Sequence, residues 1–387
     1  MGACYSQTKQ DWKITKEIKR YDKKQSRIAK LLLLGAGQSG KSTIVKQMKL
    51  IHFLTDRDHL GFTEEEKYSA KIAVYINMVD ALLTLIDAVS YLDITVPEEA
   101  NSLAFYQETL KRKRDIICSY GKQILCAISP NAQKSNNVDT PILSPSEEVL
   151  KTFKEVWSNP SIQEAYRRRN EFQLIDSTAY FMAEMERVCK KGYEPNDQDV
   201  LRTRTQTKGL TRLEFKFQFG NLRIPFEIYD VGGQKGQRKN WIHCFENVTS
   251  VLFVISIAEY DQTLEEDPNT NRMEDSMQLF GQIVNNKYFE KTPFIIFFNK
   301  YDIFKEKIPS KGIQNTFPDY DGPPDSVEES LEFLRRKYLS QIETDNLCEK
   351  LIYTHITTAT NTELVEYVFR DVMGAVLKPL LGDIQIE

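Results

Sequence analysis

A glycine-rich segment near the start of the chain has the composition of a phosphate-binding loop. Residues 35–42 read GAGQSGKS and match the pattern G-x-x-x-x-G-K-[ST]. In such a loop, glycines let backbone N–H groups wrap phosphate oxygens, Lys41 reaches the β- and γ-phosphates, and Ser42 ligates Mg²⁺. An apolar strand is expected at 30–34 and a helix at 43–52, whose N-terminus adds its dipole. The sequence therefore predicts a nucleoside triphosphate site whose contacts are Gln38, Ser39, Gly40, Lys41, Ser42 and Thr43.

A second motif, N-K-x-D, ends an apolar run and can select the base. Asp302 can accept hydrogen bonds from both N1–H and the 2-amino group of guanine, whereas adenine has an acceptor and no amino group on that edge. Lys300 would lie along the base, and Asn299 would brace the loop. Four residues are a weak pattern alone, but beside a phosphate-binding loop they favour GTP over ATP. The predicted base contacts are Asn299, Lys300, Tyr301 and Asp302.

A third motif, DVGGQ at 230–234, follows a strand expected at 226–229 and can sense a γ-phosphate. Asp230 can hold a Mg²⁺-bound water, Gly233 can offer its N–H to the γ-phosphate, and Gln234 can orient the attacking water. A D-x-x-G sequence is by itself a common turn. Its position one strand after residues 204–207 favours the γ-phosphate reading.

The elements that must position these motifs follow two patterns. Between 64 and 192, apolar residues have helical spacing, interrupted by a polar, proline-bearing stretch at 129–145 that we expect to be a surface loop. After about residue 200, strand-length apolar runs alternate with helical ones, which predicts a largely parallel sheet covered by helices. Because the strand at 30–34 belongs with the later set, we expect the helical block to be inserted into an α/β domain.

Composition excludes several classes of protein. The 387 residues are 41 % hydrophobic and 27 % charged, as in an ordinary globular chain, and the net charge of −4 argues against a nucleic-acid binder. Six cysteines lie without C-x-x-C spacing and no secretory signal opens the chain, so disulfides and zinc are not expected and the setting is predicted to be cytosolic. The longest apolar runs are far shorter than the roughly 18 residues that cross a bilayer, so no membrane-spanning segment is expected.

The N-terminal region has the features of a membrane anchor. Residues 1–8, MGACYSQT, fit the acylation pattern M-G-x-x-x-[ST], so Gly2 is a candidate for myristoylation and Cys4 for palmitoylation. One myristoyl chain holds a membrane only marginally, and a second lipid or a basic segment would complete the anchor. Residues 9–30 carry a local charge of +6 and read as a helix that docks on a protein or on anionic lipid, or else packs on its own domain.

These motifs together resemble the alpha subunits of heterotrimeric G proteins, and the resemblance covers essentially the whole chain. It implies a Ras-like GTPase domain of the α/β class with an inserted all-α domain. The boundaries would be 1–29 for an N-terminal acylated basic helix, 30–58 and 203–387 for the GTPase domain, and 59–202 for the helical domain. The matching stretches are GAGQSGKST, LRTRTQTKG from 201, DVGGQKGQRKNW from 230, AEYDQTLEED from 258, NKYD, and TTAT from 357.

The resemblance also implies roles for residues outside the three motifs. Arg204 would be a built-in arginine finger, catalytic together with Gln234, and Thr207 would be the second Mg²⁺ ligand beside Ser42. Ala359 would back the guanine. The remaining implied nucleotide contacts are Asp176 and Ser177 from the helical side, Leu201, Arg202, Thr203, Thr205 and Gln206 around the finger, and Val231 and Gly232 beside Asp230.

The same resemblance implies a slow switch that binds GTP or GDP with Mg²⁺ and hydrolyses GTP to GDP and phosphate. The expected partners are a beta-gamma dimer, a seven-helix receptor, an RGS-type GTPase activator and an unidentified effector. The expected location is the cytoplasmic face of the plasma membrane. No nucleic-acid partner is expected.

Several positions differ from the residues that are usual in the family. Gln38 stands where a glutamate usually helps to hold the finger, so Arg204 would be less restrained. Lys208, next to Thr207, and the segment 235–237, after the D-x-x-G motif, also differ from the usual residues. Thr358 replaces a cysteine, and Ile384 stands where some members carry a cysteine that a bacterial toxin modifies. A rival reading is therefore a nucleotide-gated scaffold that hardly hydrolyses GTP, and a third, an ATP-using enzyme, is disfavoured by Asp302. Because Arg204, Gln234 and Thr207 are all retained, the sequence favours a GTP-hydrolysing protein over a scaffold.

Overall fold

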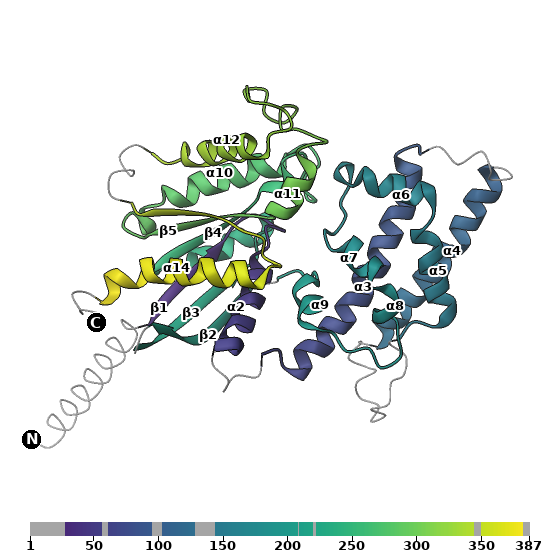
Figure 1. Ribbon diagram of the computed structural model, residues 1–387, viewed down its shortest axis with the longest axis horizontal. Coiled ribbons are helices and arrows are strands. Elements are labelled where there is room, and N and C mark those ends of the chain that lie inside the picture. The colour runs from purple at the N-terminus through teal and green to yellow at the C-terminus, as the bar shows by residue number, and fades with distance from the viewer. Residues whose placement is uncertain are drawn as a thin grey trace, which may run out of the picture. The chain divides into compact units, whose positions relative to one another are not determined.

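The chain forms two compact units in the computed structural model, which describes residues 28–55, 61–94, 103–127, 144–207, 209–219, 222–343 and 350–381 (Figure 1). The sheet unit comprises Met1–Asp56, Thr207–Asp261 and Pro268–Glu387, and the helical unit comprises Arg57–Gln206 and Gln262–Asp267. Residues 203–206 and the segment Gln262–Asp267 thus group with the helical residues, although the sequence predicted both in the GTPase domain. The predictions for the N-terminal helix, Gly2, Cys4, Lys208 and Ile384 lie outside the described residues.

The sheet unit contains a six-stranded sheet that is parallel except at one edge. The strand order is β2-β3-β1-β4-β5-β6, and only β2 runs antiparallel, paired with β3. The expected, largely parallel sheet is therefore confirmed. The bounds are β1 Ala29–Leu34, β2 Leu210–Phe219, β3 Leu222–Val231, β4 Ser250–Ser256, β5 Phe294–Asn299 and β6 Ile352–Ile356.

Strict alternation of side chains along the central strands builds one core on each face of the sheet. In β5, Phe294, Ile296 and Phe298 pack on the face covered by α10 (Arg272–Val284) and α12 (Val327–Leu339). Ile295 and Phe297 pack on the other face, under α2 (Lys41–Thr55) and α14 (Thr362–Leu381). Because both faces are buried, these strands are continuous apolar runs rather than alternating ones.

Parallel pairing brings the sequence motifs to a single edge of the sheet. The carboxyl ends of β1, β3, β5 and β6 point the same way, and ligands of open α/β sheets bind outside such ends. The phosphate-binding loop follows β1 and the T-T-A-T segment follows β6, while the D-x-x-G segment begins in the last two residues of β3 and the N-K-x-D segment in the last residue of β5.

The helical unit is organised around one long central helix, α3 (Glu64–Tyr91). A capping box starts this helix, in which Thr63 and Glu66 bond reciprocally to each other's backbone N–H groups. Its buried residues pack with the shorter helices into a separate core. Those helices are α4 Leu103–Ala127, α5 Glu147–Trp157, α6 Pro160–Arg167, α7 Thr178–Ala183 and α8 Met185–Val188, and α9 Asp197–Arg202 lies against α3 after them.

One described helix, α3, is long and apolar enough to cross a membrane by length and composition. α3 does not appear in the sequence as an uninterrupted apolar run, because polar residues such as Asp80 divide it. The apolar window of α3 is 61 % buried, and its side chains form the centre of the helical core. Core helices of folded domains meet the same criterion, so the packing accounts for the apolar character of α3.

A buried carboxylate fixes the helix that leads into the expected finger segment. Asp199 of α9 is fully buried and accepts bonds from the guanidinium of Arg187 (2.7 and 2.8 Å) and from the hydroxyls of Tyr193 and Tyr180 (2.8 and 2.9 Å). Burial by itself raises the pKa of Asp199, but these bonds and the N–H of Asn196 outweigh it and lower the pKa. Asp199 therefore anchors α9 within the helical unit.

Candidate functional site

The phosphate-binding loop is tightly organised around the ammonium group of Lys41. Lys41 Nζ is buried and donates to the carbonyl oxygens of Gly35 (2.9 Å) and Ala36 (2.7 Å). Burial lowers the pKa of Lys41 to about 8, although Asp230 acts in the opposite direction. Gln38 has φ 64° and Gly40 has φ 100°, so the chain takes left-handed turns at both positions. The loop thus holds a cation under a curved backbone.

Three oxygen-bearing side chains converge beside Lys41. The hydroxyls of Ser42 and Thr207 are 2.6 Å apart, and Ser42 Oγ donates to Asp230 Oδ2 at 3.1 Å. The other carboxylate oxygen, Asp230 Oδ1, is buried and has no hydrogen-bond partner among the described residues. Burial raises the pKa of Asp230, although Lys41 and the two hydroxyls act against that rise.

This donor set fits a magnesium ion. Mg²⁺ prefers hard oxygen ligands and keeps several of its waters, so two hydroxyls and one carboxylate suffice when phosphate oxygens complete the shell. The unpaired oxygen of Asp230 is positioned to accept a hydrogen bond from a metal-bound water. Within the part of the chain that the structure describes, no cluster of three His, Cys, Asp or Glu side chains offers another metal site.

The D-x-x-G segment lies directly against the phosphate-binding loop. A Cβ at Gly233 would lie 2.3 Å from Lys41 Nζ and 2.5 and 2.6 Å from the carbonyl oxygens of Gly35 and Ala36. Gly37 likewise faces Gln234, whose Cγ would be 3.3 Å from a Cβ at Gly37. Only a residue without a side chain permits the approach at position 233. The structure therefore brings the D-x-x-G segment and the glycine-rich loop together within the sheet unit.

Side chains outside the five-residue DVGGQ motif hold this segment. Trp241 Nε1 donates to the carbonyl oxygen of Gly232 (2.8 Å), and Arg238 Nε donates to that of Gly233 (3.1 Å). Arg238 also forms a two-bond ion pair with the buried Asp275 of α10 (3.1 and 2.5 Å). The pairing of Arg238 with Asp275 has no signature in the sequence, because no short spacing connects residues 37 positions apart.

The loop expected to hold the base is fixed by Asn299. Its Nδ2 donates to the carbonyl oxygen of Ser39 (2.8 Å), and its Oδ1 accepts from the N–H of Ala359 (2.9 Å). Gln47 of α2 donates to the carbonyl oxygen of Ala359 at 2.8 Å. The structure thus brings the segments after β1, β5 and β6 together. The bracing role expected of Asn299 agrees with these contacts.

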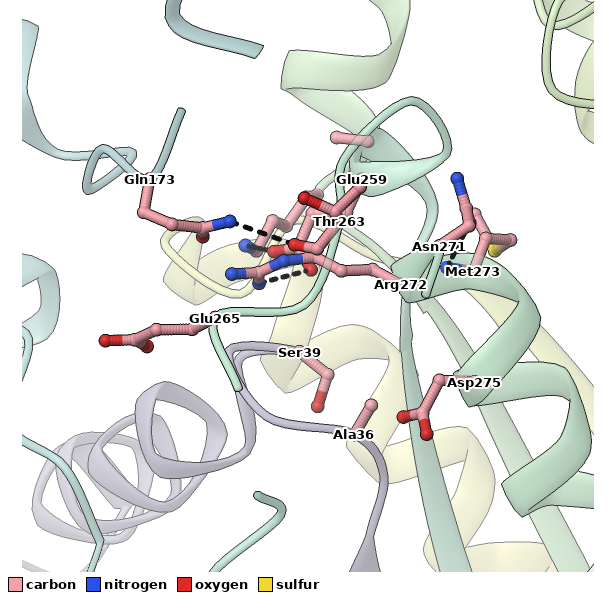
Figure 2. Close-up of polar contacts among 12 residues, drawn as sticks. Ala36, Ser39, Gln173, Glu259, Thr263, Glu265, Asn271, Arg272, Met273 and Asp275 are labelled. Atoms are coloured by element: carbon pink, nitrogen blue, oxygen red, sulfur yellow. Dashed lines mark hydrogen bonds and ion pairs between the residues drawn. The ribbon is translucent and has the colours of Figure 1, made fainter. Parts of the chain in front are cut away.

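A buried acidic residue orients the lysine of the N-K-x-D segment. Lys300 has φ 63° and directs its Nζ to Glu259, which also pairs with Arg272 at 3.0 Å. Glu259 and Arg272 are both nearly inaccessible to solvent, and Figure 2 shows their contact at the start of α10. Asp302, in the first turn of α11 (Tyr301–Lys307), is exposed, and none of the described residues pairs with its carboxylate.

The helical unit carries the other expected contacts. Asn77 of α3 grips the backbone of Arg204: its Oδ1 accepts from the Arg204 N–H (2.8 Å) and its Nδ2 donates to the Arg204 carbonyl oxygen (3.1 Å). The guanidinium of Arg204 pairs with Glu265 at 3.3 Å. Asn77 had no sequence signature, because an asparagine on a helix gives no sign of its tertiary contact.

The remaining predicted residues divide between the two units. Ser177 is buried at the start of α7, and Arg202 stacks on Tyr180 with its guanidinium 4.6 Å from the ring centre. Asp176 and residues 201–206 belong to the helical unit. The residues of the sheet unit are 38–43, Thr207, 230–234, 299–302 and Ala359.

Comparison with known proteins gives consistent matches along the chain. The model of the G-protein alpha subunit family matches residues 8–376. A guanine nucleotide-binding protein alpha-17 subunit of Caenorhabditis elegans is 36 % identical over 383 residues, covering 98 % of each chain. A G(o) subunit alpha of the same species is 38 % identical over 364 residues, covering 94 % of this chain and 92 % of the relative. A fungal alpha subunit from Coprinellus congregatus is 36 % identical over 349 residues, or 90 % and 88 %.

The two glycines of the D-x-x-G region allow a matched test of this geometry. We expect Gly233→Ala to lower the free energy of unfolding by about 1–3 kcal/mol, because the new methyl group overlaps backbone oxygens of the phosphate-binding loop. Gly236→Ala is the control, since no atom lies within 4 Å of its added Cβ. Urea unfolding followed by circular dichroism measures both. Equal stabilities of the two variants would contradict the described packing.

Proposed function

The chain belongs to the G-protein alpha-subunit family and is a GTP-binding, GTP-hydrolysing molecular switch of a heterotrimeric G protein, and we propose the roles that its residues play in that cycle. The observation that supports the proposal most is the convergence of Ser42, Thr207 and Asp230 beside Lys41. Mg²⁺ and a guanine nucleotide are the ligands of this family. We infer that these four side chains receive the metal and the phosphates.

Each of the four side chains has a separate task in this proposal. Ser42 and Thr207 would ligate Mg²⁺, and the buried Oδ1 of Asp230 would accept a hydrogen bond from a water bound to it. When bound, Mg²⁺ neutralises charge on the β- and γ-phosphate oxygens. Lys41 exchanges its two carbonyl contacts for phosphate oxygens, which is a gain because a buried ammonium is stabilised more by an anion than by neutral dipoles.

Hydrolysis in this proposal depends on placement and electrostatics. Gln234 orients the attacking water, and the N–H of Gly233 donates to the γ-phosphate. Arg204 stabilises the charge that develops on the transferred group. The protein supplies no covalent intermediate, so the rate depends on how closely these groups are held in position.

The same contacts explain how the signal arises. The γ-phosphate joins the Thr207 and Gly233 segments to one ligand, and its loss releases both of them. The second segment is also held by Trp241, Arg238 and Asp275, so its release is limited by these bonds. As a subunit of a heterotrimeric G protein, the chain is expected to expose the change to a beta-gamma dimer and a receptor.

Base selection is assigned to the exposed carboxylate of Asp302. It accepts from N1–H and the 2-amino group of guanine, while Lys300, fixed by Glu259, lies along the ring. Asn299 and Ala359 keep this loop in register with the phosphate-binding loop. Asp176, Ser177 and residues 201–206 are proposed as further contacts from the helical unit.

Regulation and anchoring are proposed from the sequence pattern. We infer an RGS-type activator acting on the switch segments and an effector that reads their GTP-bound form. Acylation of Gly2 and Cys4 would hold the chain at the cytoplasmic face of the plasma membrane.

Gln234→Leu tests the catalytic assignment. We expect single-turnover release of phosphate from γ-labelled GTP to fall by about 100-fold, because a hydrocarbon side chain cannot orient water. GTP affinity should be unchanged, and Gln237→Leu, three residues later, should release phosphate at a near wild-type rate. Tight binding of GTP by the wild type without phosphate release would instead favour the nucleotide-gated scaffold.

Asp302→Asn tests base selection. The wild type should bind GTP more tightly than ITP by at least about 10-fold. Inosine lacks the 2-amino group, so ITP loses one hydrogen bond to the charged carboxylate of Asp302. In Asp302→Asn the ratio of the two dissociation constants should approach one. Asp321→Asn, which changes another exposed carboxylate of the sheet unit, should keep the wild-type ratio. An unchanged ratio in Asp302→Asn would remove this assignment.

Intact mass spectrometry tests the anchor. Protein purified from a eukaryotic host should lack Met1 and carry the added masses of myristate and, after thiol-ester preserving preparation, palmitate. Gly2→Ala should lose the myristoyl mass, and Cys4→Ser should lose only the palmitoyl mass. An unmodified N-terminus in the wild type would exclude acylation at both positions.

A further inference from the structure

The backbone of Arg204 is fixed much more firmly than its guanidinium group. Both amide groups of Asn77 bond to the Arg204 backbone, at 2.8 and 3.1 Å, from the buried side of the central helix α3. The arginine side chain beyond Cα has several rotatable bonds, and ordering it costs entropy. A second contact is therefore needed to define where the positive charge lies.

Glu265 supplies that contact within the helical unit. Its Oε2 lies 3.3 Å from Nη2 of Arg204. Asp80 of α3 also acts electrostatically on Arg204, and burial raises the pKa of Asp80. The phosphate-binding loop, GAGQSGKST at 35–43, contains no acidic residue. The carboxylate that orients this arginine therefore comes from another segment.

The segment that carries Glu265 is itself held in place. The carbonyl oxygen of Thr263 accepts a hydrogen bond from Gln173 Nε2 at 2.9 Å (Figure 2). The next side chain, Leu264, is 7 % exposed. Glu265 therefore extends from an anchored backbone, although its own side chain is 51 % exposed. A fixed origin reduces the number of conformations in which the carboxylate must find its partner.

We propose that Glu265 is a positioning residue for Arg204 in GTP hydrolysis. This inference rests on the proposed role of Arg204 in stabilising charge on the transferred phosphoryl group. Pairing with Glu265 limits the rotamers of the guanidinium before the reaction, so less ordering is left for the transition state. Because the pair is partly exposed and screened by water, its contribution is modest, and we expect a two- to five-fold effect on the rate, about the range of exposed ion pairs.

The test compares two neighbouring glutamates. Glu265→Gln should release phosphate about two- to five-fold more slowly than the wild type in a single turnover. Glu266→Gln is the matched control: it makes the same change of charge one residue later, at an exposed side chain with no ion pair among the described residues, and should have the wild-type rate. Glu265→Asp, which keeps the carboxylate, should recover part of the rate.

Two further measurements separate positioning from a structural role. The affinity for a non-hydrolysable GTP analogue should be the same in all four proteins, since only the chemical step is affected. Raising the salt concentration from about 0.05 to about 0.5 M should slow the wild type toward Glu265→Gln, because salt screens an exposed pair. The rate of Glu265→Gln should change less.

The outcomes are distinct. Glu265→Gln with the wild-type rate, a faster rate, or a loss shared equally by Glu266→Gln would overturn the positioning role. So would weakened nucleotide binding in proportion to the loss of rate. Gln234→Leu is measured alongside: if phosphate release is absent from the wild type, or is unaffected in Gln234→Leu, the proposed function fails as well. If only the Glu265 variants behave like the wild type, the proposed function stands and this inference alone is rejected.

Discussion

One buried amide group, the side chain of Asn299, holds together the two loops that form the candidate nucleotide site. Asn299 is 1 % exposed and uses both ends of its side chain, one to hold the carbonyl oxygen of Ser39 and the other to hold the N–H of Ala359. These partners lie 260 and 60 residues away in the chain. A buried amide that lost either partner would leave a polar group unsatisfied, so the glycine-rich loop and the loop proposed to bind the base are stabilised as one unit.

The charges near this framework explain why it suits an anionic ligand with a metal. Lys41 and Asp230 are both buried. Burial lowers the pKa of Lys41 and raises the pKa of Asp230, so it favours the neutral form of each. Perturbed groups of this kind gather at functional sites because the protein retains charges that its own contacts satisfy only in part. Phosphate oxygens supply the negative charge that Lys41 needs, and a divalent cation supplies the positive charge that Asp230 needs. Ligand binding therefore stabilises two buried charges that are only partly compensated in the protein alone.

The sequence predicted the sheet and the motifs because both depend on local patterns. The expected strand at 30–34 is β1, Ala29–Leu34, and the apolar run that ends in the N-K-x-D motif is β5, Phe294–Asn299. β5 is buried along its whole length and β1 at every residue except Lys30, so both appear in the sequence as apolar runs. The motif after β1 was identifiable for a similar reason, since a loop that wraps phosphate needs glycine and lysine at fixed offsets.

The supporting side chains could not be predicted in the same way. Asn77 reaches Arg204 across 127 positions, and Asp275 reaches Arg238 across 37, so neither pair has a characteristic spacing. Glu259 and Glu265 stood in a stretch matched to a known family, but their partners are defined only by the folded chain. What positions a catalytic group is thus less visible in a sequence than the group itself.

The glycine at position 40 has a consequence for genetics. A Cβ there would lie 2.3 Å from Nδ2 of Asn299, so any other residue would disturb both nucleotide loops at once, and such alleles should behave as recessive losses of the protein. Arg204 and Gln234 are partly exposed, and their side chains are not part of the core. Alleles at those two positions should still produce a folded chain that engages its partners, and they are the ones expected to act dominantly over a normal copy.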